Sequence, residues 1–192
     1  MGRDKLPLSV GGVPILRRAC DALDEGCSEV ITVVSGPGDP PGLPAGARTV
    51  RDLRPGDGGS GAGPLAGLEA GLYYAGCPET FVAAGDMPFL STELVLEMLR
   101  RLHAGGTYAV VPRVGGRLEP LCAAYSREAL GYVSAAFDEG VRAVRDLVES
   151  LPEVEESTLE ELSVFGEPGL LLMNVNSPED LARAREAAGE GG

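Results

Sequence analysis

The sequence predicts an α/β fold: a three-layer domain with a twisted, mostly parallel sheet, helices on both faces and one antiparallel strand. Three observations support it. Short β-branched runs alternate along the chain with segments whose apolar residues have helical spacing. The segments after the strand-like runs are rich in Gly, Pro and Asp, which is typical of loops. The 192 residues, 44% of them apolar, are enough for one hydrophobic core, so we expect a single domain over residues 1–192.

The first half of the chain contains a predicted helix, two strands and a second helix. Apolar residues recur at helical spacing over residues 13–25. Residues 29–34 (EVITVV) and 47–52 (ARTVRD) are short runs typical of strands. Residues 54–63 (RPGDGGSGAG) have few side chains that can pack, so we expect a loop there. This loop leads into residues 63–76 (GPLAGLEAGLYYAG), whose composition favours a helix.

The middle of the chain continues the alternation. Residues 80–90 (TFVAAGDMPFL) begin as a short buried strand that ends near Asp86, and Ser91 is suited to cap the helix that follows. Residues 107–112 (TYAVVP) and 118–125 (LEPLCAAY) predict two strands. Because no helix separates these two strands, the second is the expected antiparallel strand.

The last part of the chain is predicted to contain three helices and one strand. Helical patterns cover residues 126–137 and 141–150. Residues 170–176 (LLLMNVN) predict a final strand, and residues 177–188 predict a helix with Ser177 as its N-cap. In mostly parallel sheets, ligands bind beyond the carboxyl ends of the strands. The loops at those ends are therefore the place to look for a site.

Composition excludes several classes of function. The net charge of −13 argues against a nucleic-acid surface, which needs clustered Lys and Arg. The acidic stretch 153–162 (EVEESTLEEL) is interpreted as a solvated surface. No run reaches the roughly 18 apolar residues of a membrane span, and the cysteines are scattered as expected in a reducing compartment. We therefore expect a cytoplasmic protein that binds neither nucleic acid nor membrane.

Asp86 is a candidate metal ligand. It follows a hydrophobic strand and comes several residues before the next helix, too early to cap it. Mg²⁺ in nucleotide sites is typically held by one or two carboxylates together with phosphate oxygens and water. The alternative is a turn residue whose carboxylate accepts hydrogen bonds from nearby backbone N–H groups.

Two further segments are suited to an anionic ligand. Residues 58–67 (GGSGAGPLAG) offer unhindered backbone N–H groups next to the positive end of a helix. A glycine-rich surface linker is the alternative for this segment. Lys5 carries a charge that suits a phosphate, and its alternative is an ordinary solvated position near the N-terminus.

Five segments together resemble the molybdenum cofactor guanylyltransferases of the MobA family: MGRDKLPLSVGGVPILRRACDAL, GPLAGLEAGL, VAAGDMPFL, RLEPLCAAY and MNVNSPEDL. The resemblance spans nearly the whole chain. It implies a Rossmann-like nucleotidyltransferase fold and the transfer of GMP from GTP to molybdopterin or the molybdenum cofactor, with release of pyrophosphate. It also implies possible contacts with molybdenum-insertion proteins or apo-molybdoenzymes.

The resemblance implies roles for particular residues. Lys5 and Asp86 are the implied catalytic residues, and Asp86 is the implied ligand of the cofactor Mg²⁺. The implied nucleotide contacts are Lys5, Asp52, Gly63, Pro64, Leu65, Ala66, Gly67 and Asp86. The residues implied to face the pterin substrate are Arg142, Asn174 and Asn176.

One part of the family pattern is not found in this sequence. In the family, an apolar strand and the pattern L-A-G-G-x-S-x-R precede the segment that MGRDK resembles. We therefore expect Met1 to correspond to an internal methionine of that motif and the upstream DNA to encode the strand and the loop.

Two other functions remain alternatives. A cytidylyl- or sugar-phosphate nucleotidylyltransferase on the same fold would share the Lys and the Asp, although GPLAG favours guanine. A non-catalytic nucleotide-binding homologue is the alternative if Met1 is the true start, because such homologues keep a fold while losing a site.

Overall fold

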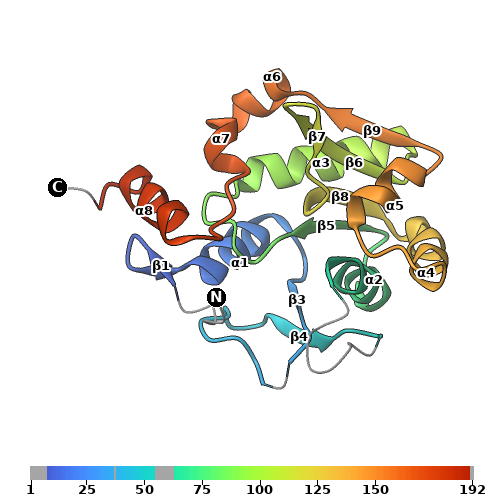
Figure 1. The fold of residues 1–192 in the computed structure, drawn as a ribbon, viewed down its shortest axis with the longest axis horizontal. Helices are drawn as coiled ribbons and strands as arrows, with labels where there is room; N and C mark the ends of the chain where they lie inside the picture. The colour runs from blue at the N-terminus through green and yellow to red at the C-terminus, as the bar shows by residue number, and fades with distance from the viewer. Residues whose placement is uncertain (1–7, 37, 55–62, 191–192) are drawn as a thin grey trace.

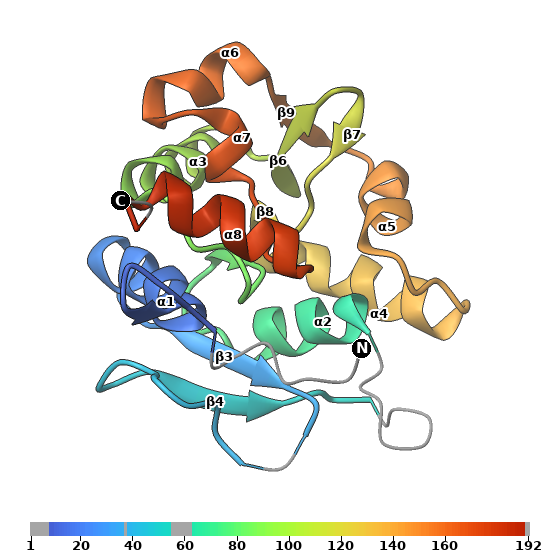
Figure 2. The ribbon, with the colours of Figure 1, turned by 60° about the vertical axis from the view of Figure 1, so that its left-hand side comes forward.

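The computed structural model describes residues 8–36, 38–54 and 63–190, in which helices cover both faces of a mixed sheet (Figures 1 and 2). The strands are β1 (Ser9–Val10), β2 (Val13–Pro14), β3 (Ile31–Val34), β4 (Arg48–Arg51), β5 (Glu79–Ala83), β6 (Ala109–Val114), β7 (Arg117–Leu118), β8 (Cys122–Ser126) and β9 (Val154–Ser157). The α-helices are α1 (Ile15–Gly26), α2 (Pro64–Tyr74), α3 (Thr92–Gly105), α4 (Leu130–Asp138), α5 (Val144–Ser150), α6 (Leu159–Leu162), α7 (Pro168–Leu171) and α8 (Pro178–Ala187). The predicted α/β architecture is confirmed.

The larger sheet has five strands in the order β5-β8-β6-β7, with β9 paired to β6. Strands β5, β6 and β9 run in one direction, and β8 runs against both β5 and β6. Strand β8 confirms the second half of the antiparallel strand predicted over residues 118–125, but Leu118 belongs to the short strand β7, which also runs against β6. Strands β3 and β4 form a separate parallel pair, and β1 and β2 form a small hairpin that was not predicted.

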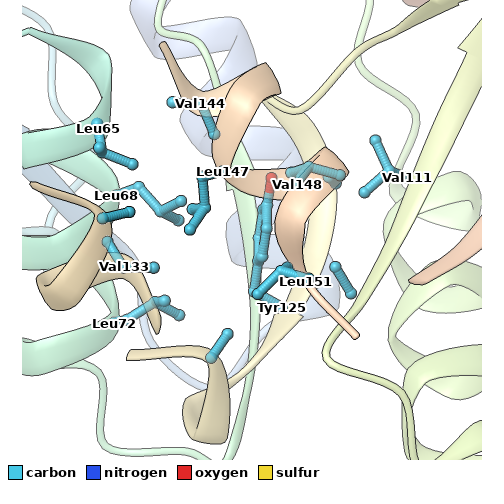
Figure 3. Packing of buried hydrophobic residues seen from close by; sticks show 14 of the residues in the cluster. Leu65, Leu68, Leu72, Val111, Tyr125, Val133, Val144, Leu147, Val148 and Leu151 are labelled. Carbon is cyan, nitrogen blue, oxygen red and sulfur yellow. The ribbon is translucent and has the colours of Figure 1, made fainter. Parts of the chain in front are cut away.

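Alternate residues along the strands face two different helical layers. Ala109 and Tyr125 belong to a core shared with α2, α4 and α5, and Figure 3 shows Leu65 and Leu68 of α2 beside this cluster. The buried Tyr125 hydroxyl donates to the Pro120 carbonyl at 2.8 Å, so its polar end is satisfied. Neighbouring residues such as Val110 belong to the core on the α3 side. The two-residue period of the strands thus produces the three layers.

The predicted caps of two helices are confirmed. The Ser91 side chain accepts from the N–H of Leu94 at the start of α3. Ser177 and Asp180 form a capping box at the start of α8, with Pro178 in the first turn. Each cap satisfies N–H groups that a helix leaves without an intrahelical partner. No helix within residues 8–36, 38–54 and 63–190 combines the length and hydropathy needed to cross a bilayer.

The strand predicted over residues 170–176 is wrong. Pro168 begins the short helix α7, which ends at Leu171, and an extended segment without strand pairing follows. Leu171, Met173 and Val175 are buried in alternation, which gave this segment the pattern of a strand. A backbone hydrogen bond from the N–H of Val175 to the carbonyl of Asp86, at 2.9 Å, instead links this segment to the turn after β5.

Most glutamates of the acidic stretch 153–162 are exposed, as a solvated surface requires, but the stretch also contains a strand that was not predicted. It contains β9, which pairs in parallel with β6, and the capping box of α6. Its glutamates reach the surface beside basic partners: Glu155 pairs with Arg101, and Glu156 with Arg113. Acidic residues are rare in strands, so the local composition concealed this strand.

Candidate functional site

The carboxyl ends of β3 and β4 meet the first turn of α2. Figure 2 shows both arrowheads on the side of the molecule where α2 begins. The N–H of Asp52, just after β4, donates to the Val34 carbonyl at 3.4 Å, so Asp52 continues the pairing with β3. A cavity of about 340 Å³ lies at this junction, lined by Val33, Ser35, Asp52, Gly63, Pro64 and Gly67. The structure therefore brings together four of the predicted nucleotide contacts from β4 and α2.

The backbone at Gly63 is suited to an anion. Gly63 is the N-cap of α2 with φ +89°, a left-handed conformation that favours glycine, and it has no side chain to cap the helix. Its carbonyl accepts from the N–H groups of Ala66 and Gly67. The positive end of the helix dipole thus faces the cavity with little steric cover.

Leu65 and Ala66 do not share this position. Both residues are fully buried, in the α2 layer of the core. Gly63 and Pro64 on one side, and Gly67 one turn later, line the cavity instead. The side chains of Leu65 and Ala66 therefore anchor the first turn of α2 in the core. They are not exposed to a ligand in the cavity.

Asp86 lies in a turn after β5, beside the segment that carries Asn174 and Asn176. The bond from the Val175 N–H to the Asp86 carbonyl joins these two segments. The Asn174 side chain donates to the Leu172 carbonyl at 3.3 Å, and the Asn176 N–H donates to Asp180 at 3.1 Å. The structure therefore brings the predicted metal ligand next to two predicted pterin contacts.

The Asp86 position fits a magnesium ion. Its carboxylate is half-buried at the carboxyl end of β5, and its backbone is held by Val175. One carboxylate is enough where phosphate oxygens and water complete the octahedron. A cluster of three or more His, Cys, Asp or Glu side chains able to hold a metal is absent from the described residues. Any metal held here therefore takes most of its ligands from the substrate and water.

Arg142 lies apart from Asp86 along the chain, between α4 and α5. Its guanidinium group is exposed, lies 4.2 Å from the centre of the Phe137 ring and donates to the carbonyls of Phe137 and Val141. A second guanidinium, that of Arg54, lies 5.0 Å from the same ring. Arg142 and Arg54, which follows β4, therefore both contact the ring of Phe137. Lys5, the other predicted catalytic residue, lies outside the described residues.

A second cavity of about 960 Å³ separates β3 from β5. It is lined along residues 28–36 on one side and 79–85 on the other. Leu16 and Cys20 of α1 and Leu68 and Gly71 of α2 also line it. Within the described residues, β3 pairs only with β4, and β5 pairs only with β8. Two strands therefore face this cavity with an edge that has no strand partner in the described part of the chain.

Sequence reasoning missed Arg54 and Glu69. The Arg54 guanidinium binds both oxygens of the Glu69 carboxylate, at 2.8 and 2.7 Å. These two bonds hold the pKa of Glu69 below its usual value. The signal in the sequence was a carboxylate among the apolar residues of GPLAGLEAGL, because an acid at such a position needs a partner.

The chain was compared with known proteins. Residues 1–155 match the model of the MobA-like NTP transferase domain. A curated protein of Pelotomaculum thermopropionicum, named as a probable molybdenum cofactor guanylyltransferase, is 35% identical over 191 residues, which cover 98% of this chain and 87% of that protein.

Two solved structures show the same fold. Molybdopterin-guanine dinucleotide biosynthesis protein A from Archaeoglobus fulgidus has a TM-score of 0.80 and 24% identity, covering 98% of this chain and 92% of that one. The 2-C-methyl-D-erythritol 4-phosphate cytidylyltransferase from Thermus thermophilus has a TM-score of 0.72 and 24% identity, covering 96% and 93%. With the family model matched over most of its length, this chain belongs to the MobA-like NTP transferase family.

Proposed function

We propose that this chain transfers GMP from GTP to molybdopterin or to its molybdenum-loaded form, with release of pyrophosphate. The observation that carries the proposal is the cavity at the ends of β3 and β4, where Asp52 meets the open first turn of α2. The curated relative named as a probable molybdenum cofactor guanylyltransferase, which matches 98% of the chain, supports the same activity.

The nucleotide would bind across the ends of β3 and β4. Gly63, Pro64 and Gly67 line the space for the base or the phosphates, and Asp52 borders it from the opposite side. The positive end of the α2 dipole supplies positive potential in a chain whose net charge is −13, whereas Pro64 has no N–H group and the N–H groups of Ala66 and Gly67 donate to the Gly63 carbonyl. Lys5, outside the described residues, is proposed to add a positive charge at the phosphates.

The acceptor would approach from the side of α8. Asn174 and Asn176 belong to the segment that Val175 ties to the Asp86 turn, so they are placed to meet a substrate that reaches Asp86. Arg142 is proposed to contact the pterin or its phosphate with its exposed guanidinium group. These three contacts are predictions from the family resemblance.

The reaction needs alignment and charge neutralisation rather than a general base. A terminal phosphate oxygen of the acceptor forms a bond to the α-phosphorus of GTP, and the bond from that phosphorus to the bridging oxygen of pyrophosphate breaks. The attacking oxygen is already ionised near neutral pH, so no proton has to be removed. We propose that Asp86 holds Mg²⁺, which when bound offsets the charge of the phosphates.

The cavity between β3 and β5 supports the expectation of a further strand. This cavity is partly open to solvent and measures about 960 Å³, which is large for a space between packed elements of one domain. The strand edges of β3 and β5 and the apolar side chains of α1 and α2 line it together. We propose that the apolar strand expected from the family pattern, contributed from outside the described residues, fills this space.

Binding of the correct nucleotide is expected to raise the melting temperature. GTP with Mg²⁺ should stabilise the chain more than CTP or ATP, because only the native state binds the ligand and the stabilisation grows with occupancy. A hundredfold excess over Kd corresponds to about 2.7 kcal/mol. Differential scanning fluorimetry with the three nucleotides at equal concentration is the measurement. Equal shifts for CTP and GTP would instead support a cytidylyltransferase.

Two parts of the proposal extend beyond the site. Contacts with molybdenum-insertion proteins or apo-molybdoenzymes are predicted only from the family resemblance. A cytoplasmic location is predicted from the scattered cysteines, and Cys20, Cys27, Cys77 and Cys122 are all free thiols in the structure.

A further inference from the structure

An ion pair between the buried Glu69 and the partly exposed Arg54 joins the two chain segments that border the nucleotide cavity. The Arg54 Nε donates to Glu69 Oε2 at 2.8 Å, and Arg54 Nη2 donates to Glu69 Oε1 at 2.7 Å. The Ser134 hydroxyl of α4 donates to Glu69 Oε1 at 2.7 Å, and Arg54 Nη1 donates to Asp138 at 2.7 Å. We call Arg54 and Glu69 the clasp. It connects the end of β4 to α2, with α4 as support.

Stability alone is a poor explanation of the clasp. Only 3% of the Glu69 side-chain surface is exposed, and its neighbours Leu68 and Ala70 in α2 are buried. Moving a carboxylate out of water is costly, and replacing a buried ion pair by apolar residues of similar size is often neutral or stabilising. A bidentate guanidinium–carboxylate pair, in contrast, fixes distance and orientation together. The bidentate pair is therefore better explained by a role in positioning the two segments that it joins.

The position of the clasp identifies what it orients. Arg54 comes two residues after Asp52, and Glu69 comes two residues after Gly67. Asp52 and Gly67 line the same cavity from its two sides. The bonds between residues 54 and 69 therefore link the two chain segments that line this cavity.

Arg54 is already engaged by two carboxylates. Its Nε and both terminal nitrogens already donate to carboxylates of Glu69 and Asp138. Its charge is balanced by these acids, so it adds little positive potential toward a ligand. Its contribution to a nucleotide must come through the residues that it holds.

We propose that the Arg54–Glu69 clasp is a positioning device of the nucleotide site, setting Asp52 against the first turn of α2 so that a nucleoside triphosphate fits between them. This inference rests on the proposed function for the identity of the ligand. The geometric part, that the clasp holds the two walls together, stands independently of that function.

The test is the double variant Arg54→Met/Glu69→Met in the full chain. It removes both charges together, so no unpaired charge stays buried and the melting temperature should remain close to that of the wild type. The Kd and KM for GTP should rise about tenfold or more, with a smaller change in kcat, because the walls of the site are misplaced. Amide hydrogen exchange at Asp52 and Gly67 should become faster.

Two further variants complete the design. Arg54→Lys keeps the positive charge but cannot form the bidentate pair with Glu69. The GTP affinity of this variant should therefore lie between those of the wild type and the double variant. The matched control is Glu97→Met/Arg100→Met, because these residues form an exposed pair on α3 with the same two contacts at 2.7 Å. The control should leave GTP affinity and exchange at Asp52 and Gly67 unchanged.

GTP binding and hydrogen exchange together distinguish a failure of the clasp proposal from a failure of the proposed function. Unchanged GTP affinity in the double variant would overturn the positioning role, whether or not exchange becomes faster. If the wild type itself does not bind GTP, the proposed function fails. In that case exchange at Asp52 and Gly67 still decides the clasp: faster exchange supports it, and unchanged exchange overturns it.

Discussion

Asp86→Asn should lower guanylyl transfer to molybdopterin by about a hundredfold to a thousandfold, because loss of several kcal/mol of charge stabilisation at the α-phosphorus has this effect on the rate. The amide keeps the shape of the side chain and its capacity to accept a hydrogen bond. It lacks the negative charge that holds a hard cation. The melting temperature should change little, because the amide can still accept hydrogen bonds and the bond from Val175 to the Asp86 carbonyl is kept.

The measurement is guanylyl transfer across a Mg²⁺ titration, together with a melting curve. Asp21→Asn is a suitable control, because Asp21 is an acid on α1 that forms a partly exposed ion pair with Arg17. If Asp86 were only a turn residue, both variants would transfer GMP at nearly the wild-type rate at every Mg²⁺ concentration.

A strand supplied to the cavity between β3 and β5 should stabilise the chain strongly. The probe is a synthetic peptide with an apolar strand followed by the pattern L-A-G-G-x-S-x-R, because a strand buried on both faces needs apolar side chains throughout. It would gain main-chain hydrogen bonds from the edges of both strands. At a hundredfold excess over its Kd it contributes about 2.7 kcal/mol, or about 5–10 °C in melting temperature for a chain of this size.

The matched control is the same peptide with proline at two central positions, which removes ladder donors and disfavours pairing in an interior strand. Only the proline-free peptide should raise the melting temperature. Equal shifts for both peptides would show that the cavity takes up apolar material without forming a strand.

The elements that the sequence predicted correctly depend on local chemistry. Ser91 and Ser177 cap their helices through N–H groups only a few residues away, so the pattern within one turn was sufficient. The glycines before α2 likewise indicated an open helix start, because Gly63 needs a positive φ. Asp52 and the start of α2 were predicted to share a site, and they line one cavity.

The errors and omissions depend on distant partners. Residues 170–176 have the alternation of a strand, but helix α7 (Pro168–Leu171) includes the first two of them, and Val175 bonds to the turn after β5 rather than to a strand. Strand β9 was not predicted because the arginines that pair with its glutamates lie far away along the chain, so its acidic residues were interpreted only as a solvated surface. The clasp was missed for a similar reason. Glu69 stands out as an acid among apolar residues, but its partner Arg54 lies beyond the glycine-rich segment, so the local sequence does not identify that partner.

The hydrogen bond between Val175 and Asp86 has a spectroscopic consequence. The Val175 N–H donates to the carbonyl of the residue proposed to bind the metal, from a segment that comes much later in the chain. The chemical shift of an amide proton follows the length and polarisation of its hydrogen bond. The Val175 resonance in a ¹⁵N-correlated spectrum therefore reports on the Asp86 turn without any label in the site, and a Mg²⁺ or nucleotide titration can be followed at that one peak.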